Sequence, residues 1–301
     1  MSASRRKTPF RLTAALLAFI SWLSALVLLG SFGALLIFIV SRGLPVFGLP
    51  LFFGDTPAFE AIFHGAPVWE GIWPAFVGTF WLIVLTMLMA LLPGIGCGIY
   101  LASENRGLLA DTLASGIELL ASVPSIVTGL FGFVLILALR RSIAPEATTS
   151  IALAAFCLAV LVMPALVVTT RSAIAGLPRS LELTGASLGF TRGQIVSRLL
   201  VPAASRGIFG GVILAMGRAA EDTAVIMLTG AVVNSGLPTG PGSKFEALPF
   251  LIYYTAAQYA DESELLRGFG ASLVLLLLSG ALALFAWLCR RSMEKRWRGY
   301  L

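Results

Sequence analysis

Long apolar segments alternate with shorter polar connections along the chain, and this alternation is its dominant pattern. A helix needs roughly 20 mostly apolar residues to cross the hydrocarbon core of a bilayer. Segments of that kind lie at about residues 12–41, 74–102, 108–139, 150–170, 205–233 and 268–289. The pattern predicts an all-α membrane protein with about six transmembrane helices. Because several segments exceed the minimum, we expect tilt or extension beyond the bilayer.

The segments between these predicted spans differ in character. Residues 43–72 and 234–267 are long and rich in Gly, Pro and acidic residues, whereas residues 171–204 are moderately polar and compatible with a helix. A basic tail, residues 1–11, precedes the first span, and we expect residues 12–301 to form one membrane domain. The start of the chain resembles a signal peptide, but its apolar run is longer than a typical signal core. An uncleaved first helix is therefore favoured.

Basic residues orient the predicted spans, because cytoplasmic connections carry an excess of Lys and Arg. With the N-terminus inside, fifteen Lys and Arg fall on the inner side and five on the outer side, while Arg218 lies within a span. Arg140 and Arg141 go against this bias. The composition agrees with a membrane location: 58% of residues are hydrophobic, 12% are charged and the mean hydropathy is +0.93. Soluble domains have roughly 25% charged residues. We predict a multi-pass protein with both termini in the cytoplasm.

The chain has few residues suited to catalysis or to holding a cofactor. None of its lysines follows a glycine, so the Gly-Lys-Ser/Thr element that holds nucleotide phosphates is missing. The single histidine, His64, falls in an outer connection, which argues against a His-ligated metal site or a serine–histidine triad within the membrane. We predict no catalytic residue and no metal site in this chain.

Small residues within the spans are interpreted as packing positions. The glycines at 94, 96 and 98 lack the strand–helix context of a dinucleotide loop, and those at 207 and 211 are four residues apart, so both sets favour close helix contacts. The cysteines share no metal-ligand spacing and have the same interpretation. They are Cys97, Cys157 and Cys289.

Three ionisable residues interrupt the fifth apolar segment: Arg218, Glu221 and Asp222. Charges at this depth cost from a few to more than about ten kcal/mol each, and by default they mark a solute or ion pathway. Their spacings of three and four would place them on one helical face. A guanidinium matches an oxyanion with paired N–H donors. We predict an anion contact at Arg218 with Glu221 and Asp222 as counter-charges, a structural ion pair being the alternative.

The third apolar segment contains a proline among small polar residues. Pro124 removes a backbone donor and should kink the helix. Ser125 and Thr128 could bond the freed carbonyls or line a polar path. A structural kink and a path lining are equally compatible with this pattern.

Residues 178–202 predict a short helix, a break at Gly189 and a second helix that stops at Pro202. The orientation above places this stretch in the cytoplasm. A short amphipathic helix presented there could dock in the groove of a partner. The same pattern also fits a helix that rests on the membrane surface.

Several of these motifs resemble a known family. Gly189, thirteen residues before Pro202, matches the glycine and proline of the "EAA" loop of binding-protein-dependent ABC importer permeases. Residues 122–127, 185–202 and 218–224, together with Gly98-Ile-Tyr-Leu-Ala and Leu248-Pro-Phe-Leu-Ile-Tyr, are more specifically similar to phosphate permeases of the PstA type. The resemblance covers about residue 70 to the end.

The chain departs from the family pattern at two places. Leu183 stands where the family's loop has glutamate, with Thr184 and Gly185 in place of the two alanines. Glu182 is one position away, a rotation of about 100° on a helix. In the second motif, Asp222 takes the place of the family's glutamate and Glu221 is an additional acid.

The resemblance implies a type I (MetI-like) ABC importer permease fold and a transport function. It implies a subunit of an ATP-driven phosphate importer in a bacterial inner membrane, which works with a PstC-like second permease, a PstB-like ATPase dimer that binds ATP and Mg²⁺, and a PstS-like phosphate-binding protein. The ATPase would seat on residues 181–200. The residues implied for this coupling are Glu182, Leu183, Gly185, Gly189 and Pro202. The alternatives are a permease for molybdate or sulfate, an ATP-independent carrier, or an intramembrane enzyme.

Overall fold

The computed structural model describes residues 8–103, 107–142 and 145–298, and its regular structure is helical apart from one β-bridge between Ala231 and Phe245. Six helical segments of the described chain are long and apolar enough to cross a membrane, as the sequence predicts. The helices are α1 (Thr8–Gly43), a 3₁₀ turn (Leu44–Val46), α2 (Leu49–Phe53), α3 (Ala58–Phe63), α4 (Trp73–Ser103), α5 (Leu108–Ser122), α6 (Ser125–Ser142), α7 (Ile151–Ala175), α8 (Arg179–Ser187), α9 (Arg192–Ile195), a π-helical turn (Val196–Leu200), α10 (Val201–Glu221), α11 (Thr223–Thr229), α12 (Leu248–Gln258) and α13 (Glu262–Arg298).

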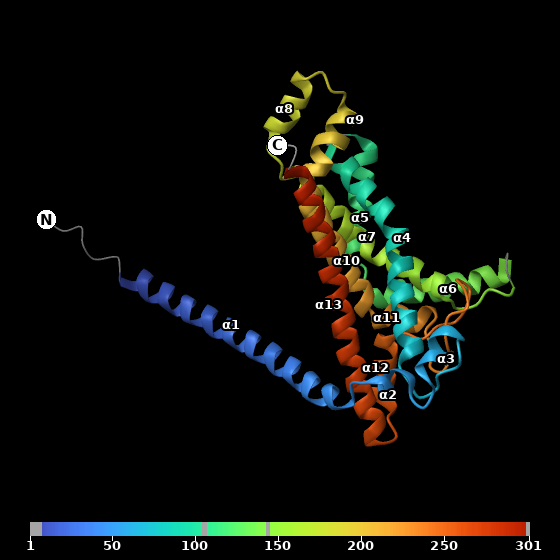
Figure 1. Cartoon of the computed structure of the whole chain (residues 1–301). Coiled ribbons are helices and arrows are strands. Elements are labelled where there is room, and N and C mark those ends of the chain that lie inside the picture. Colours follow the sequence, from blue (N-terminus) through green and yellow to red (C-terminus); the bar gives the residue numbers. More distant parts are fainter. Residues whose placement is uncertain (1–7, 104–106, 143–144, 299–301) are drawn as a thin grey trace.

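Helices α4, α7 and α10 form the core of the fold (Figure 1). Glycines bring α4 and α7 together: a Cβ at position 94 would lie 2.9 Å from the Leu166 Cβ, and one at position 98 would lie 2.6 Å from the Thr170 Cβ. The predicted packing role of these two glycines is confirmed. Gly96 has open space instead, because it points away from this contact.

Helix α10 packs against α7 beside α4, through a second pair of glycines. A Cβ at Gly207 would lie 2.4 Å from the Ala173 Cβ, and one at Gly211 would lie 2.0 Å from the Thr169 hydroxyl. The packing interpretation of these positions is also confirmed. Cys157 is fully buried in the neighbouring core, whereas the side chain of Cys289 lies outside the described residues.

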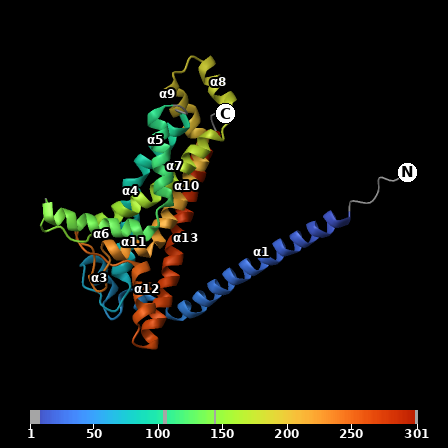
Figure 2. The ribbon, with the colours of Figure 1, turned by 180° about the vertical axis from the view of Figure 1, so that it is seen from behind.

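Helix α1 extends away from the other helices and meets them only near its C-terminal end (Figure 2). There the ring of Phe38 lies 5.4 Å from that of Phe269 on α13, and Gly43 contacts the Phe269 carbonyl. Its apolar span is 0% buried within this chain, so lipid or another chain must cover it. The predicted basic tail, residues 1–11, falls largely outside the described residues, which begin within it at Thr8.

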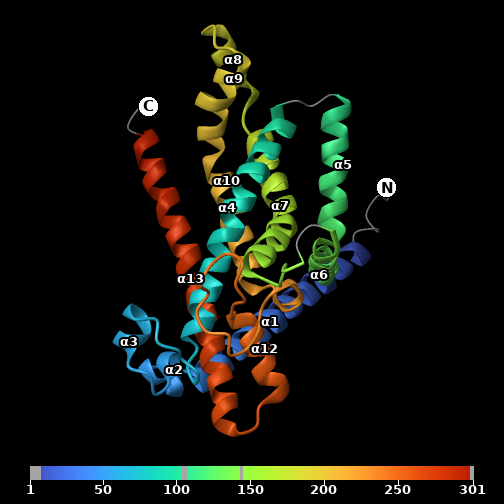
Figure 3. The ribbon, with the colours of Figure 1, turned by 90° about the vertical axis from the view of Figure 1, so that its right-hand side faces the viewer.

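The predicted third span, residues 108–139, is wrong as a single kinked helix. Val123 is extended (φ −73°, ψ 125°) and separates α5 from α6. A residue before proline is pushed out of the helical region, and Pro124 therefore ends one helix and starts another. Figure 3 shows α5 upright and α6 nearly end-on, so the two helices run in different directions. Only Ser125–Ser142 of this segment has the length and hydropathy of a span.

The molecule has two distinct ends. Helices α8 and α9 and the end of α13 lie together at one end, called here the α8 end, and α2, α3 and α12 lie at the other, the α3 end (Figure 1). At the α3 end, the backbone N–H of Leu248 donates to the Thr79 hydroxyl (2.8 Å), which fixes the start of α12 on α4. Residues 230–247 fold back over the start of α7, where the Ile151 N–H donates to the Ser243 carbonyl (3.1 Å).

Candidate functional site

The fifth predicted span is broken at Asp222. Helix α10 ends at Glu221, and Asp222 is extended (φ −75°, ψ 98°). Its Oδ1 accepts a hydrogen bond from the Val225 N–H (2.9 Å) and so caps α11. Aspartate is a favoured N-cap because its carboxylate satisfies an otherwise unpaired backbone donor. The sequence therefore encodes a discontinuous helix, a feature that membrane transporters use to form solute sites.

This break overturns the expectation that three charges share one helical face. Arg218 and Glu221 remain on α10, but Asp222 lies outside the helix, and the spacing of four no longer aligns it with Arg218. Arg218 makes no ion pair with any residue that the structure describes. The structural ion pair is therefore absent from the described chain, and the carboxylate of Asp222 is used as a helix cap instead.

Arg218 lies on a face of α10 that this chain leaves uncovered. Ala215 and Ala219 point into the core and are 0% exposed. Another side of the helix carries exposed residues at helical spacing, which we call the open stripe: Ala203, Gly210, Leu214, Arg218 and Glu221. It includes the small residues Ala203 and Gly210, and the charged residues Arg218 and Glu221 lie at its end nearest the helix break.

Ser125 and Thr128 are not brought to the open stripe. Thr128 is 7% exposed, in a part of α6 that packs against α11, where a Cβ at the adjacent Gly129 would lie 3.1 Å from the Ala224 carbonyl. Ser125 is half-buried at the first position of α6. Their assignment to a solute path stays a prediction.

Helices α8 and α9 form a compact hairpin at the α8 end. The turn between them passes through Gly189, whose φ of +77° favours glycine. A capping box starts α9, because the Thr191 N–H donates to the Gln194 side chain (2.9 Å). Arg192 donates to the carbonyl of Ser103 at the end of α4, which ties the hairpin to the core. Gly185 is buried inside the hairpin.

The outer surface of this hairpin is free within the chain. Glu182 is exposed, and Leu183 and Leu188 are 63% and 67% exposed. Two apolar side chains beside a carboxylate on a projecting helix form a surface that another protein could bind.

The expectation that the second helix stops at Pro202 is wrong. The helix continues from α9 through a π-helical turn into α10, and Pro202 occupies its first turn. Proline disrupts a regular α-helix because it lacks an N–H and its ring clashes with the carbonyl four residues back. The wider π turn that precedes Pro202 removes the need for that bond, so the proline is accommodated rather than ending the helix.

Comparison with known families identifies the family to which this chain belongs. Residues 94–299 match the family model described as "Binding-protein-dependent transport system inner membrane component". The chain belongs to this family. It is a multi-pass inner-membrane permease subunit of a binding-protein-dependent ABC importer and lacks catalytic activity itself. Such a system includes an ATPase and a binding protein as partners.

Curated relatives of the permease extend over most of its length. It is 28% identical over 247 residues to a "Probable phosphate transport system permease protein PstA" of Methanocaldococcus jannaschii, which covers 81% of this chain and 82% of the relative. It is 30% identical over 240 residues to a "Phosphate transport system permease protein PstA" of Haemophilus influenzae, which covers 79% and 80%.

The fold of the permease resembles that of a solved ABC importer. A chain from the inward-facing MetNI methionine ABC transporter matches with a TM-score of 0.56 and 16% identity, over 79% of this chain and 99% of that chain. This likeness confirms the predicted MetI-like permease fold.

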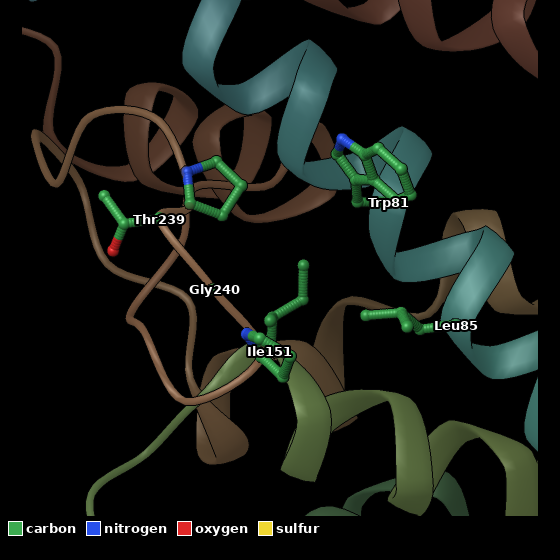
Figure 4. A pocket seen from close by; sticks show the side chains of 7 residues that line it. Trp81, Leu85, Ile151, Thr239 and Gly240 are labelled. Carbon is green, nitrogen blue, oxygen red and sulfur yellow. The ribbon is translucent and has the colours of Figure 1, made fainter.

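The permease also contains an apolar cavity that the sequence did not predict. It has a volume of about 320 Å³ and lies between α4, the start of α7 and residues 238–241 (Figure 4). Trp81, Leu85 and Ile151 line it, and no charged residue does. Because its lining is mostly apolar and carries no positive charge, this cavity is unsuited to bind an oxyanion.

Proposed function

We propose that this permease is half of the translocation path of an ATP-driven importer of inorganic phosphate. Its relatives from two organisms are named as phosphate permeases, and they align with most of the chain. The observation that carries the proposal is Arg218, a guanidinium without a carboxylate partner among the described residues, on an uncovered helix face.

The chemistry of Arg218 suits an oxyanion in transit. Its planar group offers paired N–H donors to two oxygens of a phosphate. Glu221 is exposed three residues further along the same helix. Its negative charge would weaken a bound anion, so cargo that reaches Arg218 would also be released from it.

The open stripe supports a path shared with a second chain. A charged, small-residue helix face is unfavourable against lipid, because ionisable groups at bilayer depth normally face protein or water. A PstC-like second permease would cover the stripe and close a water-filled route past Arg218. The small residues would allow its helices to approach closely.

The α8–α9 hairpin is the proposed contact with a PstB-like ATPase. Glu182, Leu183 and Leu188 form its exposed surface, while Gly185 and Gly189 set its shape. The bias of basic residues favours an orientation with the α8 end and both termini in the cytoplasm. The α3 end would then receive phosphate from a PstS-like binding protein.

Transport in proteoliposomes that contain both permeases, the ATPase and the binding protein tests this proposal. We expect ATP-dependent uptake of labelled phosphate that excess phosphate inhibits and that molybdate or sulfate does not. Inhibition by molybdate or sulfate alone would assign another cargo.

Variants of Arg218 test the path. Loss of a charge-assisted contact of about 1.5–3 kcal/mol predicts a fall in uptake of roughly 10- to 100-fold for Arg218→Gln, and a smaller fall for Arg218→Lys, which keeps the charge. Leu214→Ala, one turn away on the stripe, is the control for packing. Normal uptake by an assembled Arg218→Gln complex would exclude the pathway role.

A further inference from the structure

A polar cavity of about 200 Å³ lies at the α3 end, and Arg218 does not line it. Four separate segments line it: the connection before α4, the 230–247 connection, α12 and the first turns of α13. Its chemistry comes from two carboxylates, one guanidinium and two aromatic rings. These belong to Glu246, Glu264, Arg267, Trp69 and Tyr254.

Glu246 is the fixed element of this cavity. Its side chain is 6% exposed, and its Oε1 accepts hydrogen bonds from the N–H groups of Ser235 (2.9 Å) and Gly236 (3.0 Å). Its backbone carbonyl lies so close to α4 that a Cβ at Gly78 would approach it to 2.0 Å. The second oxygen, Oε2, accepts no hydrogen bond from any described residue. The structure therefore holds a largely buried carboxylate whose second oxygen is left accessible at the cavity wall.

A second cavity adjoins the first and adds to its negative charge. It has a volume of about 510 Å³, and Arg267 lines both. Asp55 and Glu70 contribute carboxylates to it. Over both cavities, four carboxylates therefore face one guanidinium, and Arg267 makes no ion pair with a described residue. The surroundings of Glu246 remain negative overall.

This charge is the wrong sign for the cargo proposed above. Carboxylates repel an oxyanion, so the α3-end cavity does not serve as a phosphate site. A cation fits it, because the accessible Glu246 oxygen can accept a charge-assisted hydrogen bond and aromatic faces attract ammonium and guanidinium groups. The described residues contain no group of three or more His, Cys, Asp or Glu side chains that could hold a metal ion. A basic side chain of a partner protein suits the site better.

We propose that the cavity around Glu246 receives a lysine or arginine side chain of the extracytoplasmic binding protein. This inference rests on the proposed function, because it requires the α3 end to face outward. The carboxylates that line the two cavities, called here the acidic rim, would attract a basic surface of the binding protein toward the permease. The buried carboxylate of Glu246 would fix the position of the bound partner. Phosphate would then be released beyond the acidic rim rather than captured by it.

The test measures binding-protein-stimulated ATP hydrolysis of the four-component complex in nanodiscs. Glu246→Gln keeps the acceptor for Ser235 and Gly236 but removes the charge. We expect this variant to need about tenfold more binding protein for half-maximal stimulation, with the stimulated rate recovered at saturation. Glu60→Gln is the matched control, because Glu60 is an exposed carboxylate at the same end that lines neither cavity.

A second measurement does not depend on the folding of the Glu246 variant. A photo-crosslinking residue in place of Trp69, which is 64% exposed at the cavity, should capture the binding protein. Capture of the second permease instead would overturn the inference. The inference would also be overturned if Glu246→Gln and Glu60→Gln needed the same concentration of binding protein for half-maximal stimulation in a complex that transports phosphate. That result would leave the proposed function intact. A wild-type complex without phosphate uptake would overturn the proposed function first.

Discussion

Gly185 of α8 lies directly against Ile195 of α9. A Cβ at position 185 would come within 2.9 Å of the Ile195 Cγ1 and within 2.8 Å of the Leu199 Cδ1. The two arms of the hairpin therefore touch where one side chain is missing. This contact sets how the exposed surface of α8 is presented.

Gly185→Ala should separate the arms of the hairpin and reduce coupling. Overpacking a close contact costs about 1–3 kcal/mol, and the surface of α8 would turn as the contact opens. We expect faster hydrogen exchange in α8 and a several-fold weaker stimulation of ATP hydrolysis by the binding protein. Gly193→Ala is the control, because a Cβ there meets nothing within 4 Å. Equal behaviour of the two variants would contradict this role for Gly185.

Gly189→Pro should disrupt the turn itself. Gly189 has a φ of +77°, and proline is fixed near −65°, so the substitution cannot keep this backbone conformation. We expect the complex to assemble but to lose stimulated ATP hydrolysis and uptake together. Gly189→Asn should retain most activity, since asparagine tolerates the left-handed region. Retained stimulation in the proline variant would argue against coupling through this hairpin.

Gly211→Ala should destabilise the chain, whereas Gly210→Ala should not. A Cβ at Gly211 would lie 2.0 Å from the Thr169 hydroxyl, which already donates to the Ala165 carbonyl (2.7 Å). A Cβ at Gly210 meets nothing within 4 Å. Thermal unfolding of the purified permease in detergent should show a loss of about 1–3 kcal/mol for the first variant alone.

The same pair of glycines separates internal packing from assembly. Gly210 belongs to the open stripe, so a bulky substitution such as Gly210→Leu should spare the isolated permease and weaken its binding to a second permease. Co-purification of the two permeases measures this effect. An intact heterodimer with Gly210→Leu would show that the stripe is not the interface.

Glu246 should make stability depend on pH. Burial raises the pKa of its carboxyl above the usual value near 4.5, while backbone hydrogen bonds from Gly236 and Ser235 lower it. A raised folded-state pKa means that the protonated form stabilises the fold. That stability is fully present below about pH 4.5 and is lost as the pH rises through the folded-state pKa.

We therefore expect the difference in stability between Glu246→Gln and the wild-type permease to grow as the pH rises from 4.5 toward neutrality, in favour of the variant. Thermal unfolding at a series of pH values measures it. A difference that does not change with pH would contradict a raised pKa for Glu246.

The sequence by itself determined the number of spans and the family. Apolar length is a local property, and the exclusion of backbone polar groups from lipid converts it directly into helices. The second span, predicted at residues 74–102, is found as Trp73–Ser103. The glycines at 94, 98, 207 and 211 were assigned correctly because only small residues allow such close approach.

Only the tertiary structure decided which residues share a site. The break at Asp222 depends on a single cap between its side chain and the Val225 N–H, and a spacing rule that assumes a continuous helix could not foresee it. The π-helical turn before Pro202 lets the helix continue where the sequence predicted its end, and a rule that assumes a regular α-helix could not foresee this turn either. No sequence pattern marks Glu246, because its burial arises from segments far apart in the sequence. Helical periodicity reports neighbours along one helix, whereas caps, bulges and buried charges depend on contacts between segments that the chain brings together only on folding.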